Sequence, residues 1–156
     1  MTLACEVTYG TRHPLAPGPR RIAAWAQAAA GRAGLRATLA VRVATPGESA
    51  RLNGRYRSKA YATNVLSFPD DPSGRVPGEA RPLGDLVICA RVVAREARAQ
   101  GKTLSAHWAH MVVHGVLHLL GHDHLHDDEA RRMEARERRL LAGFGIADPY
   151  AEHADG

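Results

Sequence analysis

The sequence is poor in aromatic residues, has few cysteines and contains no long apolar run. Aromatic residues make up 5% of the chain, and the two cysteines, Cys5 and Cys89, lie far apart without a C-x-x-C pair. We therefore expect neither a disulfide framework nor a cysteine metal site, and interpret both cysteines as small apolar residues of the core. No apolar run approaches the roughly 20 residues that span a bilayer, so we expect no membrane segment.

The amino-terminal residues also lack the pattern of a secretory signal. Residues 1–8 contain no basic segment followed by an apolar one, so we expect a cytoplasmic protein. A chain of 156 residues, 45% of them hydrophobic, fits one domain with a sizeable core. We assign that domain to residues 1–143 and predict a flexible carboxyl-terminal tail over 144–156.

The charge of the chain favours an anionic partner without identifying one. The formal net charge is +5, and most of the positive charge is arginine, which suits two-point contact with phosphate. A chain rich in arginine and alanine can also reflect genomic base bias. Charge alone therefore leaves nucleic-acid binding open.

Hydrophobic patterns predict an α+β fold with a single small mixed β-sheet flanked by helices. Residues 35–45 alternate in the period of two that is typical of a half-buried strand. Ser105 is a good candidate to cap a long apolar helix, which we call the metal helix because it resembles that of the zincins. We expect strands near 6–9, 35–45, 63–68 and 84–89, the last two antiparallel, and helices near 20–33, from 46, 90–100, 105–120 and 127–141.

Histidines gather on this apolar helix at the spacing of metal ligands. Seven of the nine histidines fall within residues 107–126, and His114, His118 and His124 have the spacing H-x3-H-x5-H. Helical positions four apart differ by roughly 40°, so the first two project from one face. Gly121 can adopt the left-handed conformation that ends a helix, which allows His124 to approach them. Three imidazoles with a fourth position for water predict a catalytic site with one Zn²⁺ per chain.

The same spacing occurs in the metzincin metalloproteases, with one difference that bears on mechanism. Those enzymes carry a glutamate directly after the first histidine as the general base. That position is Gly115 here, which cannot accept a proton. Asp123, beside His124, is a candidate to orient a ligand histidine from behind, although a helix-end hydrogen bond explains it equally well.

The remaining polar residues near this region have simpler interpretations. We expect His107 and His110 to be core or groove histidines, and Met133 to be a core residue. Glu134 and Glu137 lie on the last helix and could approach the metal, but charged residues on a terminal helix are usually exposed. We therefore expect both to be solvated.

A second segment, residues 52–68, combines cations and aromatics just before a predicted strand. Tyr56, Arg57, Lys59 and Asn64 could hold a phosphate backbone and stack a base. A solvated helix end that leads into an ordinary strand explains the same composition. From composition alone, the second interpretation is favoured.

Three separate motifs, in order, resemble the YbeY family of bacterial ribosomal RNA maturation factors. They read LNGRYRSKAYATNVLSFP, LGDLVICA and HGVLHLLGHDH, and the resemblance covers roughly residues 50–141. It implies a zinc-dependent, single-strand-specific endoribonuclease, a hydrolase that acts in maturation of the 3′ end of small-subunit (16S) ribosomal RNA and in late ribosome quality control. The implied partners are ribosomal RNA, the small ribosomal subunit and ribosome-associated proteins, in the cytoplasm.

The resemblance also implies roles for particular residues. It places the zinc ligands on His114, His118 and His124, and a catalytic arginine, in a cleft beside the metal, on Arg57. Within the same segment we take Tyr56, Lys59 and Asn64 as RNA-binding candidates.

The chain departs from the family pattern at two places that touch no ligand. His122 stands where such proteins often have tyrosine, and residues 59–64 lack the usual acidic residue and proline. These departures concern fine substrate preference.

Two other functions fit the same residues. One is a zinc hydrolase of peptides or amides, against which the missing base at Gly115 argues. The other is a non-enzymatic ribosome assembly factor in which zinc only stabilises the fold. For the nuclease itself, the attacking group could be water or the RNA 2′-hydroxyl.

Overall fold

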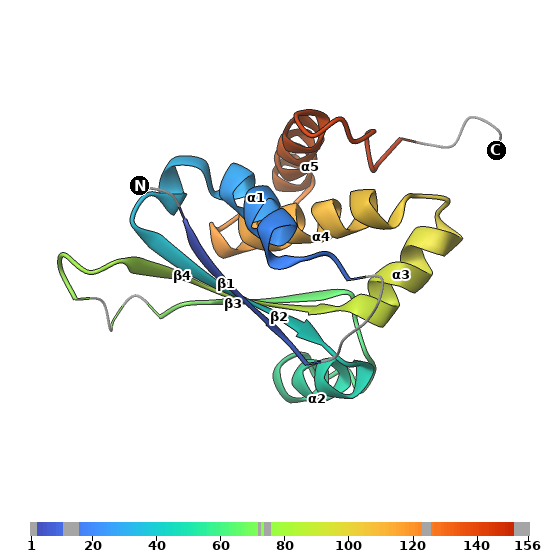
Figure 1. Cartoon of the computed structure of the whole chain (residues 1–156), viewed down its shortest axis with the longest axis horizontal. Coiled ribbons are helices and arrows are strands. Elements are labelled where there is room, and N and C mark those ends of the chain that lie inside the picture. The colour runs from blue at the N-terminus through green and yellow to red at the C-terminus, as the bar shows by residue number, and fades with distance from the viewer. Residues whose placement is uncertain (1–2, 11–15, 72, 74–75, 123–125, 152–156) are drawn as a thin grey trace.

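The computed structural model describes residues 3–10, 16–71, 73, 76–122 and 126–151, which form one mixed sheet and five α-helices (Figure 1). The α+β class and the single small mixed sheet predicted from the sequence are confirmed. In chain order the elements are β1 (Ala4–Tyr9), α1 (Pro19–Ala30), a short 3₁₀ helix (Gly31–Gly34), β2 (Ala37–Ala44), α2 (Pro46–Arg57), β3 (Val65–Pro69), β4 (Arg81–Cys89), α3 (Ala90–Ala99), α4 (Leu104–Leu119) and α5 (Asp127–Ala142).

The sheet has the strand order β1-β2-β4-β3, so β1 and β3 are its edges. β1 pairs with β2, and β2 with β4, in parallel, whereas β3 runs antiparallel to β4 as the sequence predicted. The short antiparallel strand β3 therefore forms the edge next to which α4 packs. This edge is where the candidate site lies.

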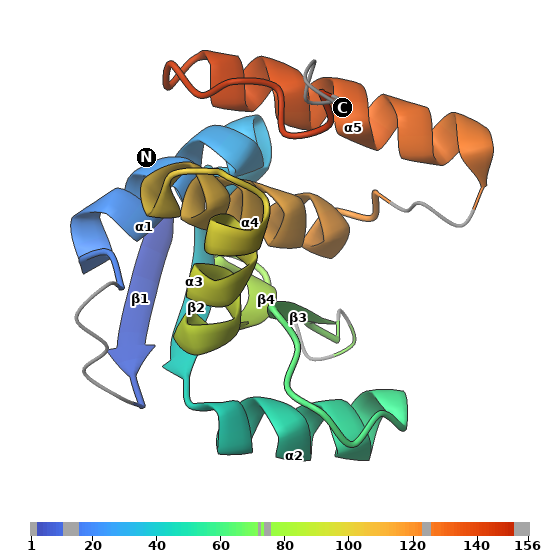
Figure 2. The ribbon, with the colours of Figure 1, turned by 90° about the vertical axis from the view of Figure 1, so that its right-hand side faces the viewer.

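The helices are unequally divided between the two faces of the sheet. Figures 1 and 2 show α2 alone on one face and α1 and α4 on the other, with α5 on the far side of α4. α4 contacts β3, β4, α1, α3 and α5. It is therefore the central helix of the fold and is covered by other elements on most of its surface.

The sequence of α4 suits this central position. Trp108, Val112 and Val116 are each at most 1% exposed, and they join the main core with residues of the sheet and α1. Removing such apolar surface from water is the main favourable contribution to folding. Two histidines of the same helix, His107 and His110, are buried and need polar partners, whereas His114 and His118 are half-buried.

The amino-terminal cap of α4 is not the predicted residue. Thr103 caps the helix, and its Oγ1 accepts a hydrogen bond of 3.1 Å from the backbone N–H of Ala106. Ser105 lies instead in the first turn. Thr103 and Ser105 are both good capping residues, and the sequence does not show which of the two has the extended backbone conformation that a cap requires.

The carboxyl-terminal end of α4 follows the prediction. Gly121 has φ = +94°, a conformation that glycine adopts without strain. Its N–H donates to the carbonyl oxygen of His118 at 3.0 Å, which satisfies one carbonyl of the last helical turn. The helix thus ends directly after the second predicted ligand.

Residues 144–151, which we assigned to a tail, fold back onto the helices. The carboxylate of Asp148 accepts two hydrogen bonds of 3.0 Å from Nε of Arg138 on α5. The flexibility predicted for residues 144–156 stays a prediction. No helix in the described part of the chain is long and apolar enough to cross a membrane.

Candidate metal centre

His114 and His118 lie one turn apart on α4 and direct the same ring atom at one point. Their Nε2 atoms are 3.1 Å apart, and their ring centroids are 4.6 Å apart. Two nitrogens bound to one tetrahedral zinc at 2.0–2.1 Å lie about 3.3 Å from each other. The pair therefore fits two positions of a zinc ion with little rearrangement.

The third predicted ligand, His124, and the supporting candidate, Asp123, lie outside the described residues. Their assignments stay predictions. The turn at Gly121 begins the chain's path from the end of α4 toward them.

Glu137 supports His114 from behind, a role that the sequence reasoning missed. Its carboxylate is fully buried and accepts hydrogen bonds from His114 Nδ1 at 3.1 Å, His110 Nε2 at 2.5 Å and Tyr150 Oη at 2.7 Å. The expectation that Glu137 is solvated was wrong. A signal was available, because Glu137 lies four residues from both Met133 and Leu141, the buried residues of α5.

Glu137 is ionised, which fixes the protonation of its partners. Burial opposes the charge, but the hydrogen bonds from His110, His114 and Tyr150 lower the pKa of the Glu137 carboxyl to about 2. A carboxylate can only accept, so His114 donates to it from Nδ1, and in the neutral imidazole Nε2 then carries the lone pair that a metal needs. A carboxylate behind a histidine in this way is typical of zinc ligands.

A second arrangement of donors exists in the same place. One ligand atom each of His110, His114 and Glu137 lie within 4.8 Å of one another, so this group could hold a metal ion. However, His110 Nε2 and Glu137 Oε2 are 2.5 Å apart, closer than the roughly 3.3 Å between two ligands of one zinc. These three residues form a hydrogen-bonded support, whereas His114 and His118 have the spacing of ligands.

A cleft of about 520 Å³ opens beside the histidine pair at the β3 edge of the sheet. It brings together most of the predicted site residues from two distant segments of the chain. Its lining includes Arg57, Lys59, Asn64, Ser67, His114 and His118. Among the residues that the structure describes, no carboxylate lines the cleft, while two cations do.

Two buried polar residues of α2 position the segment that carries these cations. Ser49 Oγ donates to the carbonyl oxygen of Thr63 at 3.1 Å and accepts from its N–H at 3.0 Å. Asn53, one turn later, donates from Nδ2 to the carbonyl oxygen of Tyr61 at 2.9 Å. The loop between α2 and β3 is thereby tied back to α2, and Lys59 within it is placed at the cleft.

Arg57 is linked to the metal helix through one residue of β3. Its Nη2 donates to the carbonyl oxygen of Ser67 at 3.1 Å, and Ser67 Oγ donates to the carbonyl oxygen of Gly115 at 3.3 Å. Gly115 is the neighbour of His114. Most of the five guanidinium N–H groups are not used by this contact and can bind an anion in the cleft.

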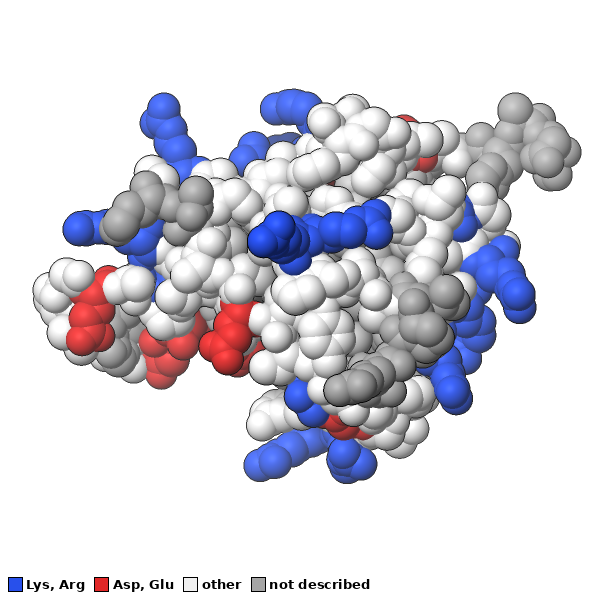
Figure 3. Space-filling view, in the orientation of Figure 1, with Lys and Arg blue, Asp and Glu red and all other residues white. Residues whose placement is uncertain are grey.

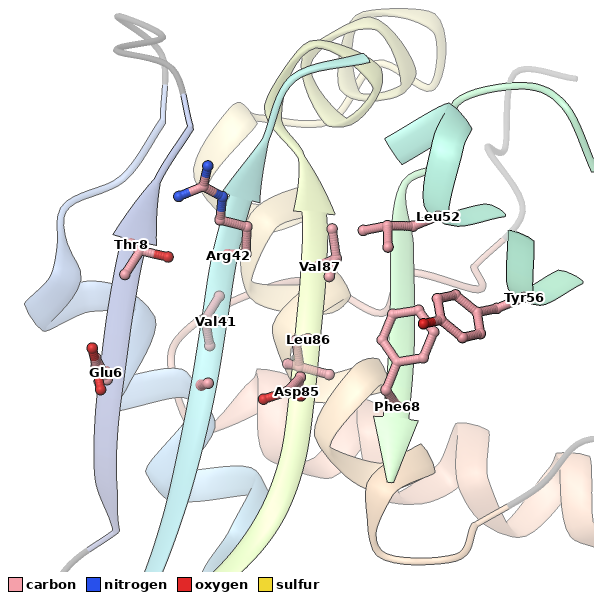
Figure 4. Close-up of a pocket in the computed structure, with 11 residues that line it drawn as sticks. Glu6, Thr8, Val41, Arg42, Leu52, Tyr56, Phe68, Asp85, Leu86 and Val87 are labelled. Carbon is pink, nitrogen blue, oxygen red and sulfur yellow. The ribbon is translucent and has the colours of Figure 1, made fainter. Parts of the chain in front are cut away.

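The structure separates Tyr56 from the other predicted site residues. Tyr56 packs edge-on against Phe68 at 5.2 Å and lines another cavity, of about 530 Å³, on the α2 side of the sheet (Figure 4). The aromatic residue that lines the metal-side cleft is Tyr61, which is 58% exposed. The role predicted for Tyr56 in RNA binding stays a prediction, while Tyr61 is better placed for it.

Asn64 lines the cleft, but protein groups hold its side chain. Its Nδ2 donates to the Glu96 carboxylate at 3.1 Å, and its Oδ1 accepts from the N–H of Val65 at 2.6 Å. Glu96 also accepts from Nε2 of the buried His107 at 2.9 Å. Asn64 therefore connects the start of β3 to α3 and α4.

The distribution of charged side chains over the surface does not identify a binding site. On the face seen in Figure 3, acidic side chains gather toward one end of the sheet, while lysines and arginines are spread over several elements. No single basic patch dominates that face. The two cations that line the cleft, Arg57 and Lys59, are therefore more informative than the overall charge.

Gly115, where metzincins have their base, faces the sheet. A Cβ built there would lie 2.8 Å from Leu86 Cδ2 and 3.3 Å from Val65 Cγ2. A longer side chain would enter the packed interface between α4 and the sheet instead of pointing at the metal. Gly115, which stands where the proteases have their general base, therefore allows α4 to pack closely against the strands.

Comparison with known proteins agrees with the motifs. The family model described as endoribonuclease YbeY matches residues 20–145.

Three curated proteins described as endoribonuclease YbeY are similar to the chain. The relative from Alkalilimnicola ehrlichii is 58% identical over 131 residues, which are 84% of this chain and 78% of the relative. The relative from Pseudomonas putida is 52% identical over 139 residues, 87% of this chain and 86% of the relative. The relative from Stenotrophomonas maltophilia is 63% identical over 117 residues, 74% of this chain and 73% of the relative.

A solved structure shares the fold. The solution structure of a protein from Thermotoga maritima has a TM-score of 0.58 and 19% identity, and covers 95% of this chain and 99% of that one. At this identity the likeness concerns the fold alone.

We predict that Gly115→Glu, which restores the protease pattern, lowers the free energy of unfolding by at least about 3 kcal/mol, because a carboxylate is forced between apolar side chains. Gly115→Ala is the matched control. Its better helix propensity, about 1 kcal/mol, offsets part of the crowding, so its loss should stay below about 2 kcal/mol. Urea unfolding of the metal-free proteins measures both, and equal stability of Gly115→Glu and the wild type would contradict the packing argument.

Proposed function

Because the chain belongs to the YbeY endoribonuclease family, whose model covers residues 20–145, we propose that it is a zinc-dependent, single-strand-specific endoribonuclease. One observation carries the proposal beyond the family name. The histidine pair with ligand spacing opens into a cleft that contains Arg57 and Lys59 and, within the described residues, no carboxylate in its lining. Such a cleft suits a phosphodiester, which is negatively charged along its whole length.

The proposed mechanism divides the work among residues of three elements. When bound, a zinc ion lowers the pKa of water to about 7 and polarises a phosphoryl oxygen. His114 and His118 would hold it, with His124 as the third ligand. Arg57 binds the phosphoryl group through its unused N–H groups and stabilises the negative charge that develops there during cleavage. Its contact with Ser67 limits the positions that the guanidinium can adopt.

The residues that line the cleft support a single-stranded substrate. Tyr61 offers an exposed ring beside Lys59 at the same cleft. An aromatic ring next to cations is the usual arrangement for single-stranded nucleic acid, whose unpaired bases can stack while the cations contact the backbone.

We further infer that the substrate is the 3′ end of 16S ribosomal RNA during maturation of the small ribosomal subunit, with a role in late ribosome quality control. This inference is supported by the family resemblance, and the two cations of the cleft support an anionic partner. It implies a cytoplasmic location and contact with ribosome-associated proteins. Hydrolysis of peptides is the weaker alternative, because position 115 carries no base and faces the sheet.

We predict that His114→Ala loses bound zinc and lowers RNA cleavage by more than about 100-fold, because a ligand contributes more than the groups that support it. His126→Ala, which changes an exposed histidine at the start of α5, is the control and should retain both properties. Mass spectrometry measures the metal content of each variant. Cleavage is measured on a single-stranded 16S fragment, and casein is tested in parallel as a peptide substrate. Full RNA cleavage by metal-free His114→Ala would refute zinc catalysis.

A second prediction separates the enzyme from a non-enzymatic assembly factor. Arg57→Ala should lower kcat by about 10²–10³-fold, as removal of one group that stabilises transition-state charge does, with a smaller effect on RNA binding. Arg55→Ala removes an exposed arginine of the same helix, one that lies over the Tyr56 ring instead of in the cleft, and should leave kcat unchanged. Equal kcat values for the two variants would refute the catalytic role of Arg57, and absence of cleavage by the wild type would favour the assembly factor.

The third prediction concerns base stacking. Tyr61→Ala should weaken binding of single-stranded RNA by about 1–3 kcal/mol, the usual contribution of one stacked base. Tyr56→Ala is the matched variant and should bind like the wild type, because its ring contacts Phe68 on the other side of the sheet. Fluorescence anisotropy with a labelled oligonucleotide compares them, and the reverse order of affinities would return the stacking role to Tyr56.

A further inference from the structure

The carboxyl-terminal segment, residues 144–151, reaches the metal centre through one side chain. Tyr150 Oη lies 2.7 Å from Glu137 Oε2, and the Tyr150 ring packs edge-on against His110 at 5.3 Å. Two further hydrogen bonds hold the residues just before this contact. Lys102 Nζ donates to the carbonyl oxygen of Pro149 at 3.3 Å, and Asp148 Oδ1 accepts from the N–H of Tyr150 at 2.8 Å.

The two oxygens of Glu137 have different tasks. Oε2 accepts from both His110 and Tyr150, whereas Oε1 faces His114 Nδ1 at 3.1 Å. The two donors on Oε2 fix the rotation of the carboxylate, which aims Oε1 at His114. Without that acceptor, the proton of His114 could move to Nε2, the atom that faces His118, and Nε2 would lose the lone pair needed for a metal.

We propose that Glu137 and Tyr150 are positioning residues that set the tautomer of His114, so that residues 144–151 are part of the metal centre. The proposal rests on the metal site of the proposed function and concerns metal affinity instead of the choice of RNA. It assigns a function to a segment that lies beyond the last helix.

The segment is only partly packed against α4, so its polar contacts are an important part of what holds it there. A cavity of about 450 Å³ lies between the start of α4 and the segment, with Ala106, His110, Ile146 and Pro149 among its walls. The segment is therefore not packed against α4 along its whole length. Tyr150→Phe keeps the ring against His110 and removes only the hydroxyl, which lies 2.7 Å from Glu137 Oε2 and 3.2 Å from His110 Nε2, so it tests these polar contacts without changing the packing.

The experiment compares wild type, Glu137→Gln, Tyr150→Phe and Tyr9→Phe. Tyr9 is the matched control, because its hydroxyl also makes one hydrogen bond, of 2.8 Å to the carbonyl oxygen of Pro17, away from the metal centre. Zinc affinity is measured by competition with a chelator. Long-range ¹H–¹⁵N spectra of the metal-free proteins report which nitrogen of His114 carries the proton, a signature that general destabilisation does not change.

We expect zinc affinity to fall about 10–100-fold in Glu137→Gln, as is usual when the partner behind a ligand histidine is changed. In Tyr150→Phe it should fall about twofold to tenfold, the range of one hydrogen bond. Both variants should show His114 partly protonated on Nε2, and Tyr9→Phe should match the wild type.

Wild-type affinity and tautomer in Glu137→Gln would overturn the proposal, and the same result in Tyr150→Phe would remove the carboxyl-terminal segment from it. If Glu137→Gln does not fold, Tyr150→Phe decides alone. Absence of zinc binding by the wild type would instead refute the proposed function, while the spectra of the metal-free proteins still test the tautomer.

Discussion

The buried carboxylate of Glu137 is the interaction on which the arrangement around α4 depends. α4 lies between the sheet and α5, so its buried histidines, His107 and His110, depend on partners within the protein, while His114 and His118 are half-buried at the cleft. One ionised group from α5 accepts hydrogen bonds from His110 Nε2 and His114 Nδ1 together, and Tyr150 adds a third. An uncompensated charge there would be strongly unfavourable, so α4, α5 and the carboxyl-terminal segment must be placed together.

The parts of the site that follow from local geometry were predictable. The facing of His114 and His118 follows from the helical period, and the end of the helix follows from the tolerance of Gly121 for positive φ. Glu137 was missed because its burial is a tertiary property, although its spacing from Met133 placed it on the inward stripe of α5. A charge on that stripe is informative because burying it requires partners.

The placement of the two tyrosines of this segment also depends on tertiary structure. Tyr56 and Tyr61 are close in sequence, but α2 ends between them at Ser58, which adopts a left-handed conformation with φ = +59°. The chain changes direction there, so one ring stays on the α2 side of the sheet and the other reaches the metal side. Composition identified the segment, but the side of the sheet on which each tyrosine lies depends on the backbone conformation of Ser58. Asn53 then fixes the new direction through its bond to Tyr61.

The edge position of β3 explains how elements from opposite faces of the sheet share one cleft. α2 and α4 lie on different faces, and only at an edge strand can the end of one approach the other (Figure 2). Ser67 makes the connection, accepting from Arg57 and donating to Gly115. At the same position of α4, a Cβ on residue 115 would lie 2.8 Å from Leu86 Cδ2, so only a small residue fits against the sheet there. The packing of α4 against the sheet disfavours a glutamate at position 115, while Arg57 shares the cleft with His114 and His118. This combination supports the proposed stabilisation of phosphoryl charge over the protease reaction.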